Sequence, residues 1–398
     1  MDKLDFLTSQ LQELKKANLL RNFVCIDSPQ QTTVQIDGQE KVLFCSNNYL
    51  SLANHPRIIQ AVIEAIRKYG HGAAASRLLS GTMRPHLKLE RKLAALLQKE
   101  AALVFPSGWT ANEALITTLP SKGDLLLLDK LDHASIIDAA NSSPAEFRTY
   151  RRGAYQRLEK FLAANNDRRK FIITESIFSM DGDEADLQTL VRLRNKYDAF
   201  LIVDEAHAFG CLGATGAGLA EQLGLLDNVD VVVATMSKAL AAAGGVVAAP
   251  KAVIDLLINK ARSFIYTTAP TVANCAAASA ALEILNTEPQ RREKLRKNAE
   301  YLRHRLNQLA INTARSSSHI IPVIIGKEKD ALTVSSKLYE MGFFVPAIRP
   351  PTVPLGTARL RLSLQTDHNR QQMDRLCDGF DNLIKQGVLP QRMPRSFL

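Results

Sequence analysis

Between residues 200 and 249, two short apolar runs each end in residues that can carry out acid–base or nucleophilic chemistry. The first run ends in Asp204, with His207 three positions later, and the second ends in Thr235, with Lys238 three positions later. Such runs are typical of buried parallel strands, and α/β proteins bind ligands just outside the carboxyl ends of these strands. A lysine among small residues can bond a carbonyl group as a Schiff base, while a nearby acid keeps a ring nitrogen protonated. The spacing therefore favours a site for a Schiff-base cofactor.

Each of these residues taken alone has an ordinary structural explanation. Asp204 could cap the next element, and Lys238 could be a solvated surface lysine, since lysines are mostly exposed. The combination of an acid, a histidine and a lysine at the ends of two predicted strands is what favours chemistry over structure.

Two further predicted strands end in candidate residues. Residues 102–105 are predicted to form a strand that turns at Ser107 and Gly108 into a helix. The free amides and the dipole of such a helix start would bind an anion, although a plain N-cap by Ser107 explains the same sequence equally well. His133 follows the predicted strand 124–128, where it could either be a structural histidine or stack on a ring.

Composition places the chain among ordinary globular proteins. It has 398 residues, of which 46% are hydrophobic and 23% charged, so disorder is not expected. The net charge of +10 would suit a nucleic acid, a phosphorylated cofactor or an acidic protein partner. No basic tract with interleaved aromatic residues occurs, and the pairs Arg151-Arg152 and Arg291-Arg292 are expected to be solvated, so nucleic acid is the weakest of the three.

Cysteine spacing and the start of the chain argue against other classes. The five cysteines are scattered, with no Cys-x-x-Cys pair, so neither a zinc site nor a disulfide framework is predicted. The first residues lack the basic-then-apolar pattern of a signal peptide, and the longest apolar run, residues 239–250, is too short to cross a bilayer. We therefore expect a cytoplasmic protein without a metal site and without membrane contact.

Predicted strands alternate with helical patterns along the middle of the chain, which favours an α/β fold with a mostly parallel sheet and helices on both faces. We expect an N-terminal helix and hairpin over residues 1–45, a large domain over 46–286, a smaller α+β domain over 287–390 and a loose tail over 391–398. The strands predicted for the large domain are residues 102–105, 124–128, 170–174, 200–203 and 230–234.

Elements outside the large sheet carry three arginines of interest. A helix is predicted over residues 4–20, with Arg21 at its end, where a positive charge is favourable. In the small domain, strands are predicted at residues 319–325, 343–347 and 359–364. Arg359 and Arg361 would share one face of the last strand, where an arginine could hold a carboxylate or form an inter-domain salt bridge.

In their order along the chain, the motifs resemble those of the α-oxoamine synthases, a family of pyridoxal 5'-phosphate (PLP) enzymes of fold type I. The resemblance runs from about residue 11 to residue 385 and implies a mostly parallel seven-stranded sheet. Its motifs are Ser46-Asn47-Asn48-Tyr49-Leu50, Phe178-Ser179-Met180-Asp181-Gly182, Asp204-Glu205-Ala206-His207, Thr235-Met236-Ser237-Lys238, and Pro350-Pro351-Thr352-Val353-Pro354 followed by Gly356-Thr357-Ala358-Arg359-Leu360-Arg361. The last motif is the one that separates the branch using L-alanine and a pimeloyl thioester from its relatives.

The resemblance implies PLP as the cofactor and assigns four residues to its ring. Lys238 would form the Schiff base, and Asp204 would pair with the ring nitrogen. His207 would contact the ring hydroxyl, and His133 would stack on the ring face next to the substrate.

The same resemblance implies a phosphate site and a homodimer. The amides of Gly108 and Trp109 would bind the phosphate, with the hydroxyls of Ser179 and Thr235 nearby. Thr268, or its neighbour Thr267, would reach the phosphate held by the other subunit, so the active sites would be shared.

Four residues are implied as contacts of the two substrates. Asn47 and Arg361 would orient the carboxylate of the amino acid, and Arg21 and Thr352 would face the acyl group. The implied reaction is a decarboxylative condensation of L-alanine with a pimeloyl thioester, with the acyl group carried either by coenzyme A or by acyl carrier protein.

Two other functions agree with most of the motifs. A sister branch of the family condenses glycine with acetyl-CoA, and the Pro350–Pro354 loop is the feature that argues against it. A catalytically inactive relative would keep the fold without the chemistry, which the joint presence of Lys238, Asp204, His207 and His133 argues against.

The chain departs from the family pattern where it has alanine in place of glycine. The positions are Ala208, Ala241 and the three alanines of Gly72-Ala73-Ala74-Ala75-Ser76. Because alanine adopts a positive φ only at a cost, the resemblance leaves the loop geometry and the rate open at these positions.

Overall fold

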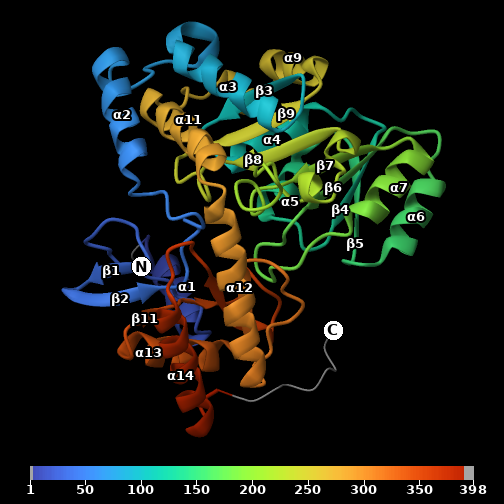
Figure 1. Cartoon of the computed structure of the whole chain (residues 1–398). Coiled ribbons are helices and arrows are strands. Elements are labelled where there is room, and N and C mark those ends of the chain that lie inside the picture. Colours follow the sequence, from blue (N-terminus) through green and yellow to red (C-terminus); the bar gives the residue numbers. More distant parts are fainter. Residues whose placement is uncertain (1–2, 390–398) are drawn as a thin grey trace. The chain divides into compact units, whose positions relative to one another are not determined.

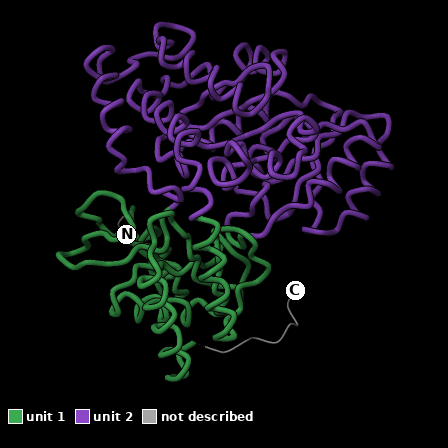
Figure 2. Tube along the Cα trace, viewed as in Figure 1, with its two compact units in different colours: residues 1–46, 180–182, 295–398 green, residues 47–179, 183–294 purple. Residues whose placement is uncertain are grey.

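The computed structural model describes residues 3–389, and the chain divides into two compact units (Figure 2). Unit 1 contains the chain up to Ser46, the short segment Met180–Gly182 and the chain from Leu295 onward. Unit 2 contains Asn47–Ser179 and Asp183–Lys294. The tail predicted from residue 391 lies outside the described residues.

Unit 2 is built on a seven-stranded sheet with strand order β3-β9-β8-β7-β6-β4-β5 (Figure 1). Strands β8, β7, β6, β4 and β5 pair in parallel, and β9 runs antiparallel to both of its neighbours, so the predicted mostly parallel sheet is confirmed. The strands are β3 (Ala101–Phe105), β4 (Leu125–Asp129), β5 (Glu146–Tyr150), β6 (Lys170–Glu175), β7 (Phe200–Asp204), β8 (Val231–Thr235) and β9 (Gly245–Ala249).

The five strands predicted for the large domain all form, whereas β5 and β9 were not predicted. Strand β5 is a largely polar edge strand, and β9 has only two β-branched residues, Val246 and Val247, between glycine and alanine, so neither has the longer β-branched run typical of a buried strand. The helices of this unit are α2 (Pro56–Tyr69), α3 (Arg84–Leu96), α4 (Gly108–Thr118), α5 (Ala134–Ser142), α6 (Tyr155–Ala163), α7 (Leu187–Tyr197), α8 (Leu219–Gln222), α9 (Lys251–Lys260), α10 (Arg262–Ile265) and α11 (Val272–Thr287).

The core of unit 2 holds α4, α5 and α9 against one face of the sheet. Leu115 of α4, Ile136 of α5 and Leu257 of α9 are fully buried with the inward side chains of the strands. Each such side chain contributes about 1.5–3 kcal/mol to folding. This packing fixes the start of α4 and the start of α5 beside the carboxyl ends of the strands, where the candidate residues lie.

Unit 1 contains two small sheets. The hairpin of β1 (Thr33–Ile36) and β2 (Gln39–Leu43) turns at Asp37 and Gly38, whose φ angles of 50° and 71° are those of a tight hairpin turn. The other elements are α1 (Asp5–Lys16), β10 (Ile320–Gly326), α13 (Glu328–Glu340), β11 (Phe343–Phe344), β12 (Ala347–Ile348), β13 (Ala358–Ser363) and α14 (Arg370–Lys385). Helix α12 (Gln290–Gln308) begins with the last residues of unit 2 and continues into unit 1.

Two expectations for unit 1 are wrong. The strand predicted at residues 343–347 divides into β11, which pairs with β2, and β12, which pairs with β13, because Pro346 between them has no N–H for a ladder. The N-terminal helix ends at Lys16 rather than at residue 20, since Asn18 has a φ of 59° and breaks it. Arg21 is therefore not at a helix end.

Within residues 3–389, no helix is long and apolar enough to cross a membrane. The same residues contain no group of three or more His, Cys, Asp or Glu side chains that could hold a metal ion.

Candidate active site

Lys238 and His207 meet at the carboxyl edge of the sheet of unit 2. Lys238 follows β8 and His207 follows β7, and Lys238 Nζ lies 2.9 Å from His207 Nε2. The other ring nitrogen, His207 Nδ1, lies 2.7 Å from the hydroxyl of Tyr49, and this hydroxyl donates to Asn47 Oδ1 over 2.9 Å. Four side chains thus form one hydrogen-bonded chain, of which the sequence motifs assigned roles to Lys238, His207 and Asn47 but not to Tyr49.

Asp204, the last residue of β7, is held by a buried amide. Asn112 Nδ2, from the inner face of α4, donates to Asp204 Oδ2 over 2.9 Å and to Ser135 Oγ over 3.1 Å. The backbone amide of Ala206 donates to Asp204 Oδ1 over 2.9 Å. Sequence reasoning missed Asn112, although a lone amide among the apolar residues on the buried side of a helix was a usable signal.

His133 is both a structural and a site residue. It caps α5, where its Nδ1 accepts from the amide of Ser135 over 3.2 Å and lies 2.8 Å from the Ser135 hydroxyl. Burial lowers the pKa of His133, and Lys238 lowers it further while Asp204 opposes the shift. The ring is therefore neutral near pH 7, and its edge-to-face neighbour is Trp109, with ring centroids 6.0 Å apart.

The start of α4 has both features that the sequence allowed, an N-cap by Ser107 and backbone amides that could bind an anion. Ser107 caps the helix, with its Oγ accepting from the Thr110 amide over 3.1 Å. Within residues 3–389, the amides of Gly108 and Trp109 donate to no other group, so they are available to an anion. A Cβ on Gly108 would lie 3.5 Å from Thr235 Oγ1, which places that hydroxyl beside the helix start.

Gly244 and Gly245, at the start of β9, allow this close approach. A Cβ on Gly245 would lie 2.2 Å from the Ser107 carbonyl oxygen and 2.8 Å from Gly108 Cα. Thr235 Oγ1 also donates to the Gly244 carbonyl over 3.0 Å and lies 2.7 Å from Ser237 Oγ. Strand β9, the turn before α4 and the end of β8 therefore form one rigid corner.

Buried acids lie behind this edge of the sheet. Glu175, at the end of β6, is the register partner of Asp204, and its backbone amide donates to Asp132 Oδ1 over 3.0 Å. Burial raises the pKa of Glu175 to about 8, with Asp204 adding to the shift and Lys238 and Arg152 opposing it. Glu175 therefore holds a proton at pH 7 and adds no negative charge beside Asp204.

Arg152 is not the solvated charge that its Arg-Arg pair predicted. Its guanidinium pairs with Asp183 and lies over the ring of Phe178 at 3.1 Å. These contacts hold the loop after β6, which carries the partly exposed Ser179. Arg292 also departs from the prediction, since it is buried and donates to the Leu285 carbonyl over 2.8 Å.

Thr268 lies on an exposed rim of unit 2. It forms an isolated antiparallel bridge with Ser76, and the amide of Ala269 donates to the Ala75 carbonyl over 3.0 Å. The alanine-rich loop and the segment after α10 are therefore fastened together, with Thr268 itself facing solvent.

Positive φ angles occur at two of the five alanines for which the resemblance implies glycine. Ala74 has a φ of 55° and Ala241 has a φ of 52°, whereas Ala73, Ala75 and Ala208 have none in that range. Each positive φ costs an L-residue about 1–2 kcal/mol. Ala74 and Ala241 thus hold a left-handed conformation despite their side chains, and Ala241 closes the turn after Lys238 by donating from its amide to the Lys238 carbonyl over 2.9 Å.

In unit 1, Arg21 and Thr352 belong to a network around the proline-rich loop. Arg21 Nη2 donates to the Pro350 carbonyl over 3.2 Å, and the Thr352 amide donates to the Arg349 carbonyl over 3.1 Å. Arg349 in turn donates to the Asn18 carbonyl. The segment after α1 is thereby fastened to the loop, and the side chains of Arg21 and Thr352 are exposed.

The two arginines of β13 have different partners. Arg359 pairs with Asp181 within unit 1, so it is occupied by a structural ion pair. Arg361 donates to Ser363 Oγ over 2.6 Å and is 8% exposed. Of the two, Arg361 is the better candidate for a substrate carboxylate.

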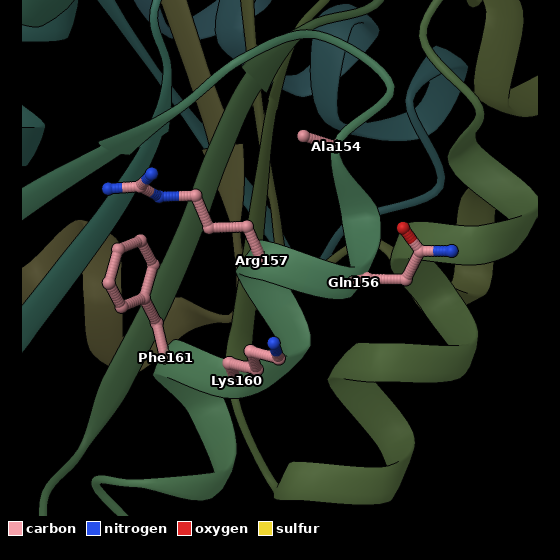
Figure 3. Close-up of a pocket in the computed structure, with 5 residues that line it drawn as sticks. All are labelled: Ala154, Gln156, Arg157, Lys160 and Phe161. Atoms are coloured by element: carbon pink, nitrogen blue, oxygen red, sulfur yellow. The ribbon is translucent and has the colours of Figure 1, made fainter.

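The pocket drawn in Figure 3 lies on α6 and includes none of the residues considered above. Its lining residues, Ala154, Gln156, Arg157, Lys160 and Phe161, belong to α6 and the turn before it. The candidate site is therefore defined by side-chain geometry at the strand ends.

The amino-acid sequence is similar to those of known PLP-dependent enzymes. Residues 39–380 match the family described as aminotransferase class I and II. An 8-amino-7-oxononanoate synthase of Geobacter sulfurreducens is 42% identical over 383 residues, which are 96% of this chain and 98% of the relative.

Solved structures show the same fold. A serine palmitoyltransferase of S. paucimobilis, solved with a bound PLP–myriocin aldimine, superposes with a TM-score of 0.92 at 30% identity, over 97% of this chain and 99% of that chain. An 8-amino-7-oxononanoate synthase of Francisella tularensis superposes with a TM-score of 0.75 at 28% identity, over 88% of this chain and 99% of that chain. The predicted fold type I of PLP enzymes is confirmed. The chain belongs to the aminotransferase class I and II family and groups there with the 8-amino-7-oxononanoate synthases.

Proposed function

We propose that the protein is a PLP-dependent 8-amino-7-oxononanoate synthase, which condenses L-alanine with a pimeloyl thioester. The observation that carries the proposal is the 42% identity to such a synthase across 98% of the relative's length. The serine palmitoyltransferase superposes with the higher TM-score, but at 30% identity. Because substrate choice depends on side chains rather than on the backbone, sequence identity is a better guide to the substrate than the TM-score.

The residues of unit 2 fit PLP group by group. The free amides at the start of α4 and the Thr235 hydroxyl suit a phosphate, and the buried carboxylate of Asp204 suits a protonated ring nitrogen. The Lys238 amine suits the aldehyde, and the neutral ring of His133 suits the ring face. When bound, PLP supplies an electron-withdrawing ring that stabilises negative charge on the α-carbon of the amino acid.

The chain's own residues then handle the proton and the substrates. Lys238 is the general base for the α-proton of L-alanine, and His207 Nε2 at 2.9 Å accepts a hydrogen bond from the protonated amine. Asn47 and Arg361 orient the amino-acid carboxylate, while Arg21 and Thr352 face the acyl chain. The new carbon–carbon bond joins the α-carbon to the acyl carbon, the thiol leaves, and the carboxylate departs as carbon dioxide.

The proposal includes a cytoplasmic homodimer with shared active sites. Thr268 is exposed and fastened to Ser76, a position from which it would serve the phosphate of the other subunit. Large apolar side chains are exposed on nearby segments of unit 2, at Leu78, Leu79 and Tyr266, and a second copy would cover them.

Thiol release by the PLP-loaded protein tests the function. L-alanine with pimeloyl-CoA is compared with glycine plus acetyl-CoA and with L-serine plus palmitoyl-CoA. Release with the first pair alone supports the proposal, and release with either other pair alone overturns the substrate assignment while keeping the fold and the cofactor. If all three are silent, the first pair is repeated with pimeloyl-acyl carrier protein, and continued silence rejects the proposed activity.

A further inference from the structure

We infer that Tyr49 is a positioning residue that fixes the tautomer of His207, so that the bare nitrogen of the ring faces Lys238. Tyr49 has no role among those implied by the sequence motifs. The protons available to the hydrogen bonds that link Asn47, Tyr49, His207 and Lys238 determine the tautomer. Its kinetic consequence rests on the proposed function, whereas the tautomer itself does not.

Tyr49 is held in place before it contacts His207. Its side chain is fully buried, and its amide donates to the Asn47 carbonyl over 2.8 Å. The neighbouring Asn48 side chain accepts from the amides of Leu52 over 2.8 Å and Ala53 over 3.1 Å. These bonds fasten the turn from both sides, so the hydroxyl of Tyr49 has one position relative to the end of β7.

The direction of each hydrogen bond follows from the donors available. A tyrosine hydroxyl has one proton, and the side-chain oxygen of Asn47 can only accept. The bond of 2.9 Å between them therefore uses the Tyr49 proton. The second contact of the hydroxyl, at 2.7 Å to His207 Nδ1, must then be donated by the imidazole. A neutral His207 consequently carries its proton on Nδ1 and a lone pair on Nε2.

The lone pair on Nε2 is the group that Lys238 needs. At 2.9 Å, Nε2 accepts a hydrogen bond from the lysine amine. The opposite tautomer would point an N–H toward an ammonium that can only donate, and a charged imidazolium would place two cations in contact. Tyr49 therefore sets, through His207, how well Lys238 is stabilised after it has taken a proton.

Nitrogen-15 NMR of histidine-labelled full-length protein tests the tautomer, first without added cofactor and then after PLP loading. The His207 signals are assigned by their loss in His207→Gln. We expect Nδ1 to be protonated and Nε2 to be bare in the wild type. In Tyr49→Phe, which keeps the ring but removes the acceptor, the Nδ1-protonated form should lose its preference. Tyr155→Phe removes another hydroxyl that accepts a bond, from the amide of Asp186 over 3.2 Å, and should leave His207 unchanged.

The kinetic readout separates positioning from folding. We expect Tyr49→Phe to lower kcat about tenfold or more, while KM for L-alanine changes little, because the lost interaction acts on the proton and not on substrate binding. A wild-type His207 protonated on Nε2 overturns the inference even if Tyr49→Phe fails to fold, and so does an unchanged tautomer in a folded Tyr49→Phe. Failure of the protein to use pimeloyl-CoA would affect the proposed function and leave the NMR result standing.

Discussion

Glu175 and Asp204 are register partners at the ends of the adjacent parallel strands β6 and β7, so two carboxyl groups terminate side by side at the carboxyl edge of the sheet. They are not equivalent. Burial and the charge of Asp204 raise the pKa of Glu175 to about 8, whereas Asp204 accepts two hydrogen bonds, from Asn112 and from the Ala206 amide. At neutral pH, Glu175 thus adds no negative charge beside the carboxyl group of Asp204.

Replacing Glu175 by glutamine should change how stability depends on pH. Folded Glu175 holds its proton up to about pH 8, whereas the unfolded residue loses it near its ordinary pKa of 4.5, so unfolding releases a proton between these values. Wild-type stability therefore falls through this window as the pH rises, and Glu175→Gln removes that fall. Urea unfolding across the window should show the variant gaining stability relative to the wild type as the pH increases. Parallel curves would contradict the raised pKa.

Asp204→Asn should keep the fold and lose the chemistry. Asparagine retains the shape of the side chain and can still bond the Asn112 amide through its oxygen, but it cannot balance a protonated ring nitrogen. We expect PLP to bind with little loss, while kcat falls by roughly a hundredfold or more. Absorbance titration gives the binding and thiol release gives the rate. Turnover near that of the wild type would remove Asp204 from this role.

The same substitution, alanine to glycine, should have opposite effects on stability at Ala241 and at Ala208. Ala241 has a φ of 52°, so glycine at this position relieves backbone strain of about 1–2 kcal/mol. Glycine also raises the entropy of the unfolded chain, which offsets part of this gain, so the free energy of unfolding should rise by less than about 1 kcal/mol. Ala208 is fully buried without a positive φ, so Ala208→Gly should destabilise by about 1 kcal/mol. Urea unfolding of both variants gives the change in the free energy of unfolding. A change of the same sign in both would show that the φ angle does not determine the effect.

Local sequence signals were enough to predict the residues at the strand ends but not the side chains that contact them. Apolar runs that end in polar residues marked β6, β7 and β8, and with them Asp204 and Lys238. The partners of these residues are distant in the chain: Asn112 is 92 positions from Asp204, and Tyr49 is 158 positions from His207. No periodicity reports such contacts, because they depend on how the sheet brings separate segments together.

The wrong expectations have a common physical origin. Arg152 and Arg292 were treated as solvated from their local charge, yet tertiary contacts supply each with buried partners. The strand predicted at 343–347 runs through Pro346, and because this proline has no N–H, the strand divides there. In each case a contact or a missing donor outweighed a local propensity.

Gly245→Ala should damage the phosphate corner specifically. The added Cβ would lie 2.2 Å from the Ser107 carbonyl oxygen, so the turn before α4 must move and take the amides of Gly108 and Trp109 with it. We expect the affinity for PLP to fall by about tenfold or more, with some loss of stability. Gly72→Ala is the matched control, since its Cβ would have nothing within 4 Å. Equal PLP affinity in the two variants would contradict the assignment of this corner.

Arg361 and Arg359, two residues apart on one face of β13, should respond differently to lysine. Lysine cannot reproduce the planar, two-pronged contact of arginine with a carboxylate, so Arg361→Lys should raise KM for L-alanine about tenfold. Arg359→Lys weakens the ion pair with Asp181, which is mostly buried, and should lower the free energy of unfolding by about 1–2 kcal/mol without a comparable change in KM. Steady-state kinetics and urea unfolding of both variants separate the roles. If Arg359→Lys raises KM as much as Arg361→Lys does, both arginines contribute to the substrate carboxylate, and the structural assignment of Arg359 is wrong.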